Sequence, residues 1–153
     1  MSGYLRRPPR IKVLEAAGAI ADGRVVFTGD GCARVTSSMG DRVYTVCVDV
    51  ERGLAYSDDN GTVYRGYVGY PIIAVLMLKG VLPFDKRIAE ALKGIEWKRL
   101  NERYKRYAVV ERIVKGIAEK RGVGREEIDE FVERVMAALS RLRLRKAPGP
   151  FKP

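Results

Sequence analysis

The chain has 153 residues, enough for one compact domain with an appended element, and 46% of them are hydrophobic, which excludes wholesale disorder. The formal net charge of +10 favours a polyanionic partner, although such a charge also serves solubility. Histidine is absent, so the commonest general base and metal ligand is missing.

The N-terminal residues 1–12 are basic, contain Pro8-Pro9 and are predicted to form a flexible arm. A short helix is then expected from Ile11 to Ala21, because apolar residues recur there at helical spacing. Asp22-Gly23 would end this helix.

Residues 24–66 are predicted to form a small antiparallel sheet, a β-meander, because short runs of β-branched and aromatic residues alternate with turn residues. Asn60-Gly61 is the strongest hairpin signal, since this dipeptide tolerates the positive φ angles of a type I′ turn. Five strands are therefore expected, and the fifth would be the run TVYRG at 62–66.

Helices are predicted from residue 70 onward, where the pattern changes to longer apolar periodicity. They cover 72–78, 83–93, 97–120 and 125–146, and residues 147–153 would form a flexible tail. The predicted fold class is α+β: an antiparallel sheet packed with helices in a nucleic-acid-binding domain at 13–122, followed by a zipper-like dimerisation helix at 123–146.

The two cysteines, Cys32 and Cys47, do not form a CxxC pair, which argues against a zinc site, and no metal is expected. Both lie in predicted strands, where buried thiols are favoured and a disulfide stays open. Walker A, GxGxxG and GxSxG motifs are absent, so no catalytic residue or cofactor is predicted and the chain is not expected to be an enzyme.

The positive charge is unevenly distributed. Residues 13–96 hold 9 basic and 11 acidic side chains, whereas residues 97–121 hold nine basic and three acidic ones. Six basic residues and no acidic residue follow Glu133. The electrostatic field therefore comes from the two ends of the chain and from one helix.

Two groups of residues are candidates for binding nucleic acid. The first consists of tyrosines and arginines on the sheet and the following loop, which would stack bases and contact phosphates: Arg42, Tyr44, Tyr56, Tyr64, Arg65 and Tyr67. Alternatively, these tyrosines cover the core. The second group is the basic face of the helix that begins at Trp97: Lys98, Arg99, Arg103, Lys105 and Arg106. A solvated face is the alternative for this helix, and its stripe of Trp97, Leu100, Tyr104 and Tyr107 is expected to be core.

The last predicted helix carries apolar residues in a 4-3-4-3 spacing, typical of a short coiled coil: Ile128, Val132, Val135, Leu139 and Leu142. This seam predicts a homodimer. The alternative is that the seam packs back on its own domain.

A secretory signal peptide is not recognisable, and the longest apolar run, Ile72 to Leu78, is too short to span a bilayer. The sequence therefore predicts a cytoplasmic protein without a membrane partner. The scarcity of Asn and Gln beside many charges is typical of a thermophile.

The layout resembles the ThermoDBP family, single-stranded DNA-binding proteins that replace the OB-fold type in a group of hyperthermophilic archaea. The resemblance rests on the basic N-terminus, the small sheet, the segments GYPIIAVLMLKG and IEWKRLNERYKRY, and the zipper-like C-terminal helix. It implies a homodimer held by the last helix and a cleft of apolar and basic residues that binds single strands.

The predicted function is sequence-tolerant binding of single-stranded DNA, which would coat or protect the strand through phosphate contacts and base stacking. Alternatives are an RNA-binding protein and a dimeric adaptor whose basic face docks an acidic protein. An enzyme of unknown chemistry ranks third.

Overall fold

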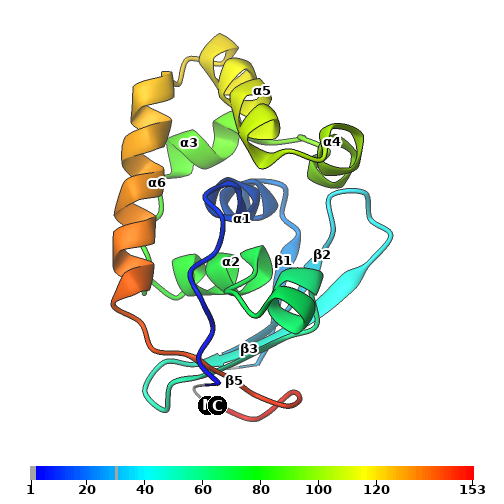
Figure 1. Ribbon diagram of the computed structural model, residues 1–153, viewed down its shortest axis with the longest axis vertical. Helices are drawn as coiled ribbons and strands as arrows, with labels where there is room; N and C mark the ends of the chain where they lie inside the picture. Colours follow the sequence, from blue (N-terminus) through cyan, green and yellow to red (C-terminus); the bar gives the residue numbers. More distant parts are fainter. Residues whose placement is uncertain (1–2, 30) are drawn as a thin grey trace.

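The computed structural model describes residues 3–29 and 31–153 and confirms the α+β class. A five-stranded sheet of order β1-β2-β3-β4-β5 lies at one end of the molecule, and the helices stack above it (Figure 1). The segments that begin and end the described chain meet under the sheet (Figure 1).

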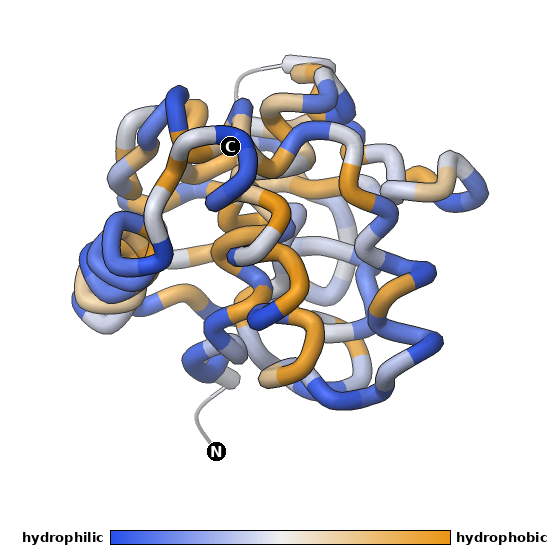
Figure 2. The backbone as a smooth tube through the Cα atoms, turned by 90° about the horizontal axis from the view of Figure 1, so that it is seen from above, coloured by the Kyte–Doolittle hydropathy of each residue, from blue (hydrophilic) through white to orange (hydrophobic). Residues whose placement is uncertain are grey.

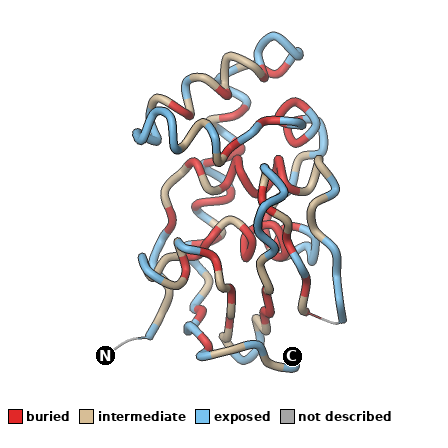
Figure 3. The backbone as a smooth tube through the Cα atoms, turned by 90° about the vertical axis from the view of Figure 1, so that its right-hand side faces the viewer, coloured by how far each residue is buried: buried red, intermediate tan, exposed pale blue. Residues whose placement is uncertain are grey.

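Helix α1 (Ile11–Ala21) is the centre of the core and has the predicted bounds. It contacts α2 (Tyr70–Leu78), α3 (Lys86–Ala91), α5 (Tyr107–Lys120) and α6 (Arg125–Ser140). Small residues make this possible, because Ala16, Ala17 and Ala19 let neighbouring backbones approach and are themselves fully buried. Apolar segments accordingly gather inside the molecule (Figure 2), and buried residues run through its middle (Figure 3).

The first four strands form the predicted antiparallel meander: β1 (Val25–Gly29), β2 (Cys32–Thr36), β3 (Val43–Asp49) and β4 (Leu54–Ser57). Alternation along the strands puts Val35, Val46 and Val48 on the face that is buried under α2. The other face carries Cys32, Cys47 and Tyr56, which are aligned across β2, β3 and β4.

The predicted Asn60-Gly61 hairpin is wrong. Asn60 has helical dihedral angles, and residues Gly61–Arg65 form a short π-helix, η1, in place of a strand. The buried Asp59 carboxylate accepts hydrogen bonds from the Thr62 backbone N–H at 3.1 Å and from its hydroxyl at 2.8 Å. A carboxylate that accepts from a backbone N–H three residues further on favours the start of a helix, and this local contact outweighs the turn preference of Asn-Gly.

The fifth strand comes from the other end of the chain. Strand β5 (Arg145–Lys146) pairs parallel with β4, and Ala147 donates to Ala55 O at 2.8 Å. The predicted arm is held in the same place, since Leu5 N donates to Leu144 O at 2.8 Å and Tyr4 is bridged to Arg145. Both predictions of flexible ends are therefore wrong for the described residues, while residues 1 and 2 lie outside them.

The predicted helix at 97–120 is two helices, α4 (Trp97–Tyr104) and α5. Lys105 adopts a left-handed conformation (φ 55°) and ends α4, and Arg106 is extended before α5 begins. The break lets Trp97 and Val110 point into the core from helices of different direction. Tyr104 and Tyr107 flank the break and are exposed, so the predicted core stripe holds only at its beginning.

Helix α6 packs along the side of the molecule (Figure 1) and ends at Ser140, six residues before the predicted end. Ile128, Val132, Val135 and Leu139 are buried against the chain's own core, and Leu142 lies beyond the helix. The seam therefore packs back on its own domain and offers no free apolar face to a second copy. Dimerisation stays a prediction without an assigned surface.

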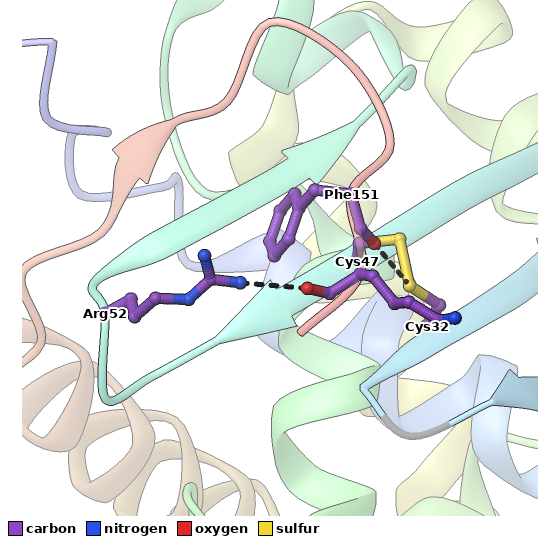
Figure 4. The surroundings of a disulfide bond; sticks show 5 residues. Cys32, Cys47, Arg52 and Phe151 are labelled. Carbon is purple, nitrogen blue, oxygen red and sulfur yellow. Dashed lines mark hydrogen bonds between the residues drawn. A yellow bond between two sulfur atoms is a disulfide. The ribbon is translucent and has the colours of Figure 1, made fainter.

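Cys32 and Cys47 form a disulfide between paired positions of β2 and β3, with Cα atoms 4.1 Å apart, so the buried thiols favoured from the sequence are not observed. The C-terminal segment lies over this bond (Figure 4). The Phe151 carbonyl oxygen is 3.3 Å from Cys32 Sγ, and Arg52 donates to Lys152 O at 2.9 Å. Among the described helices, none has the length and apolar character that crossing a membrane requires.

Replacing Ile128 with alanine distinguishes a core residue from a dimer contact. Since Ile128 is fully buried within one chain, we expect Ile128→Ala to lower the free energy of unfolding by about 2–5 kcal/mol at every protein concentration. Glu133→Ala on the exposed side of α6 is the control and should change it by less than about 0.5 kcal/mol. Chemical denaturation at two protein concentrations measures the free energy of unfolding of both variants. A loss of stability that disappears at high concentration would place Ile128 in a dimer interface.

Candidate functional site

A cleft of about 540 Å³ opens between α1, the β2–β3 turn, η1 and α4. Its walls are both polar and apolar and carry four basic and three acidic side chains: Lys12, Arg24, Arg65 and Lys98, with Glu15, Asp59 and Glu102. Tyr44, Tyr70 and Trp97 supply aromatic surface. A cleft of this size with convergent polar groups is typical of a site for a small ligand or part of a larger one.

The wall formed by α1 contains a buried carboxylate. Glu15 is 3% exposed, and Lys12 Nζ lies 3.2 Å from its Oε1. Burial by itself would lower the pKa of Lys12, but Glu15, Tyr67 and Tyr107 together outweigh burial and raise the pKa above its usual value. Asn101 Nδ2 on α4 donates to the same Glu15 oxygen at 2.8 Å. The buried charge is thereby paired, and it ties α4 to α1.

Helix α4 is fixed at its N-terminus to the β2–β3 turn. The Lys98 backbone N–H donates to Ser38 Oγ at 3.0 Å, and the Lys98 ammonium forms an ion pair with Asp41. The hydrogen bond from Lys98 raises its own pKa and lowers that of Asp41. Trp97 meets α1 at Gly18, where an added Cβ would lie 2.8 Å from the indole Nε1. The glycine therefore makes room for the indole ring.

The opposite wall depends on Asp59, which is buried at the end of β4. Its carboxylate accepts hydrogen bonds from the Ser57 hydroxyl and from Thr62, and the Thr62 hydroxyl accepts from Gly69 N at 3.2 Å. These bonds hold η1 in place and so position Arg65 at the cleft. Asp59 therefore has a structural role in this wall.

The two tyrosines in the cleft meet edge to face, with the ring centroids of Tyr44 and Tyr70 6.2 Å apart. Burial raises the pKa of both hydroxyls, so both stay protonated at neutral pH and can donate hydrogen bonds. Arg42 lies over the outer part of this pair, 5.3 Å from the centroid of Tyr44.

Three buried polar atoms of the cleft residues have no hydrogen-bond partner among the described residues: Arg24 Nη2, Trp97 Nε1 and Asn101 Oδ1. Arg24 is otherwise well bound, since it donates to Thr36 O at 2.7 Å and pairs with Asp22. Buried polar groups are nearly always satisfied in folded proteins, and ordered water is one of the partners that satisfy them.

A second feature adjoins the cleft at η1. Here the two ends of the chain bring together exposed cations and aromatic rings that we call the terminal basic surface: Tyr4, Arg6, Tyr64, Arg65, Arg143, Arg145 and Lys146. Arg6 donates to Arg65 O, and Lys146 Nζ donates to Val63 O at 3.0 Å. Within residues 3–29 and 31–153, no ion pair neutralises its five cations.

The two tyrosines of the terminal basic surface, Tyr64 and Tyr4, lie in different environments. Tyr64 is 80% exposed, the largest value given by any bulky apolar or aromatic side chain in the described residues. Tyr4 lies between two guanidinium groups, 5.1 Å from Arg145 and 5.7 Å from Arg143, measured to its ring centroid. The hydrogen bond from Arg145 lowers the pKa of Tyr4.

The predicted binding residues do not form one site. Tyr44, Arg65 and Lys98 line the cleft, and Tyr64 lies on the terminal basic surface. Tyr56 faces the opposite side of the sheet from Tyr44, because it pairs with Cys47, three residues after Tyr44. Tyr44 and Tyr56 therefore cannot belong to one stacking face.

The remaining candidates are divided between the interior and α4. Tyr67 packs against Gly61, and burial, opposed in part by Lys12, raises the pKa of Tyr67 to about 12. It is therefore closer to the covering role that the sequence left as an alternative. Exposed positions on or beside α4 are occupied by Arg99, Arg103, Lys105 and Arg106, and Arg42 is exposed before β3.

Sequence reasoning missed most of the cleft and five of the seven residues of the terminal basic surface. Glu15 is a carboxylate within an otherwise apolar helix, and Asn101 is one of only two asparagines, which were the available signals. The alternation of Arg141, Arg143 and Arg145 with two leucines is typical of an edge strand, but it was assigned to a helix. No local pattern joins these residues to the N-terminus.

Residues 5–145 match the family described as "Uncharacterised conserved protein UCP014422", and the chain belongs to this family. Comparison with curated proteins and with solved structures gave no match. The match does not connect the chain with the ThermoDBP family, so that resemblance stays a prediction.

Substituting Gly18 tests the contact that seats Trp97 beside the cleft. We expect Gly18→Ala to lower the free energy of unfolding by about 1–3 kcal/mol, because its Cβ would overlap the indole of Trp97. The matched control is Gly116→Ala in α5, where the nearest atom is the flexible end of Arg125 at 3.4 Å. This control should raise the stability by up to about 1 kcal/mol through helix propensity. Equal effects of the two substitutions on thermal unfolding would contradict the close contact at Gly18.

Proposed function

We propose that this protein binds single-stranded DNA, with phosphates on the terminal basic surface and a base stacked on Tyr64. The observation that carries the proposal is the Tyr64 ring, 80% exposed on η1 and surrounded by cations without carboxylate partners. An aromatic ring exposed to this degree has a free face on which an unpaired base can stack.

The cations of this surface are suited to a polyanion. Arg6, Arg143 and Arg145 come from two chain ends that are joined by backbone hydrogen bonds, which holds their guanidinium groups over a fixed frame. Arginine contacts phosphate through two parallel N–H groups and stays charged at every physiological pH. Phosphate contacts of this kind give affinity without reading sequence, in keeping with sequence-tolerant binding.

Stacking explains why a single strand would be preferred. A surface that offered charge alone would favour duplex DNA, whose charge density is higher. Unpaired bases present their faces to aromatic rings, whereas duplex bases are covered by their neighbours. Tyr64 is the exposed ring for this contact, and Arg65 next to it belongs to both the terminal basic surface and the cleft.

Cations suited to phosphate contacts also lie on α4, at the far side of the cleft. Arg103 and Lys105 are exposed there, and the Arg103 guanidinium lies 5.5 Å from the centroid of the Tyr104 ring. A DNA strand that crosses the cleft would contact basic and aromatic groups on both sides of it. An RNA strand or an acidic protein would meet the same charges, and the experiments below distinguish these partners.

Removing the ring of Tyr64 should weaken binding of oligo-dT by about 1–3 kcal/mol, the usual contribution of one stacked base. The melting temperature should not change, because the ring is exposed. Tyr64→Trp is the control and should retain or strengthen binding, since it keeps an aromatic face. Fluorescence anisotropy with oligo-dT, oligo-rU, duplex and a polyglutamate peptide measures affinity and preference. Unchanged binding of oligo-dT by Tyr64→Ala, or tighter binding of the duplex or the peptide, would contradict the proposal.

Phosphate contacts should appear in the salt dependence of binding. Each contact with a single strand contributes about 0.7 to the slope of log K against log salt, so we expect Arg65→Ala/Arg143→Ala to reduce the slope by about 1.4. Lys79→Ala/Lys120→Ala removes the same net charge from exposed positions on other elements and should leave the slope unchanged. If both double variants reduce the slope equally, net charge and not the terminal basic surface determines affinity.

A further inference from the structure

We propose that two copies of this chain associate through strand β1, which pairs antiparallel with β1 of the second copy. Strand β1 lies at one edge of the sheet and is hydrogen-bonded to β2 alone. Four of its five residues are exposed, which holds for no other strand of the meander. An exposed edge strand is a template for a further strand, because the backbone groups on its outer side have no partner.

The pairing with β2 shows which backbone groups of β1 are free. Thr36 N donates to Arg24 O at 2.9 Å, so the position that next exchanges hydrogen bonds with β2 is Val26, two residues later. The N–H and C=O groups of Val25 and Phe27 therefore point away from β2, toward the edge. In the part of the chain that the structure describes, none of these four groups has a backbone partner.

Both faces of this edge are apolar. Val26 points to the outer face of the sheet and is 60% exposed, while Phe27 points to the side of the helices and is still 43% exposed. Edge strands are usually protected by charged residues or proline, and Val25–Gly29 contains neither. The register with β2 is regular up to Phe27 and becomes irregular only after it. An apolar edge without these protections indicates pairing with another strand.

One register pairs every free group of two β1 strands. If Val26 lies opposite the second copy's Val26, Val25 lies opposite the second copy's Phe27, and each such pair exchanges two hydrogen bonds. The twofold axis passes through the Val26 pair, whose side chains meet on the outer face with Cα atoms about 4.5 Å apart. Registers displaced by two residues place a free group opposite the turn at Gly23 or the irregular end at Gly29.

The charge distribution fits a second copy at this edge, although each chain carries +10. Strand β1 is uncharged, and Arg24 lies opposite the second copy's Thr28, so like charges do not face each other. The two exposed Arg34 side chains are three strand spacings apart, about 14 Å, which exceeds the Debye length of about 8 Å. A polyanion or an acidic peptide finds no cation on β1, whereas a second β1 finds an uncharged strand with matching backbone groups.

Pairing joins the two sheets into one and leaves the terminal basic surfaces at its outer edges, because β5 lies at the opposite edge from β1. Strands of this length make a small interface, at or below the about 1,200 Å² of the smaller specific interfaces. We therefore expect a reversible dimer with a dissociation constant of about 10–100 μM. The inference does not rest on the proposed function, because no nucleic acid takes part in the contact.

Sedimentation of the intact protein without nucleic acid tests the association and needs no variant. Between about 1 μM and about 1 mM protein at physiological salt, we expect the dimer to replace the monomer. A monomer at every concentration overturns the proposal and leaves the edge free or open to a segment of another protein. Growth beyond the dimer also overturns it, since a twofold strand pair closes at two copies.

Replacing Val26 with lysine tests whether β1 is the surface. Val26→Lys places two ammonium groups opposite each other, and we expect it to weaken association at least about tenfold. Val43→Lys is the matched control: Val43 lies on the same face and is 54% exposed, but its strand β3 is inside the sheet. This control adds the same charge and should change the dissociation constant by less than about twofold. Circular dichroism checks that both variants fold. Equal weakening by both variants, or weakening by neither, refutes the assignment to β1.

Replacing Val26 with cysteine tests the register, and it introduces no charge. Under mild oxidation we expect Val26→Cys to form a disulfide-linked dimer, because Cα atoms about 4.5 Å apart lie within the range of disulfides. Val43→Cys is the control and should stay monomeric on a non-reducing gel. Peptide mapping distinguishes the new bond from exchange with the Cys32–Cys47 disulfide. Equal cross-linking of the two variants, or none of Val26→Cys, overturns the proposed pairing.

Discussion

The Glu15 carboxylate lies at the centre of this structure, on a helix that is packed on nearly all sides by other helices. A charge in this position is stable only if it is paired and hydrogen-bonded, because its hydration is lost. Lys12 and Asn101 satisfy this requirement from the same helix and from α4. The interaction therefore does more than compensate a charge: it holds α4 away from the sheet and keeps the cleft open between them.

The two ends of the chain provide a second structural constraint. Backbone bonds from residues 3–6 and 144–147 add a strand and two bridges to the end of the sheet. Basic residues of the two chain ends are thus held side by side, and their mutual repulsion lowers the stability of the folded chain. Such clusters of like charge are typical of surfaces that bind polyanions. The cleft and this surface meet at η1, whose position is set by Asp59. A buried carboxylate in the wall of the cleft thereby determines how they adjoin.

The disulfide on the outer face of the sheet has a separate role in the fold. It joins the two central strands, and the last residues of the chain lie across it, with Arg52 bound to the Lys152 carbonyl (Figure 4). The C-terminal segment thus covers the part of this face around the disulfide, while Val26, Arg34 and Val43 of the same face are exposed. The terminal basic surface begins where that segment leaves the sheet.

Local patterns in the sequence were sufficient to predict α1, four strands of the meander and the α+β class, because apolar spacing of about 3.6 or 2 residues reports which face of an element is buried. They also identified Tyr44, Arg65 and Lys98, since exposed or half-buried aromatic and basic residues stand out in a near-neutral region. The helix that begins at Asn60 depends on a local contact, between Asp59 and Thr62, that competes with the turn preference of Asn-Gly. Two features could only be decided by the tertiary structure. The apolar seam of α6 is used by the chain's own core, and β5 pairs with a strand some ninety positions earlier in the sequence. Each depends on a partner that is distant in sequence, and a local pattern records that a side chain must be buried or paired without recording by what.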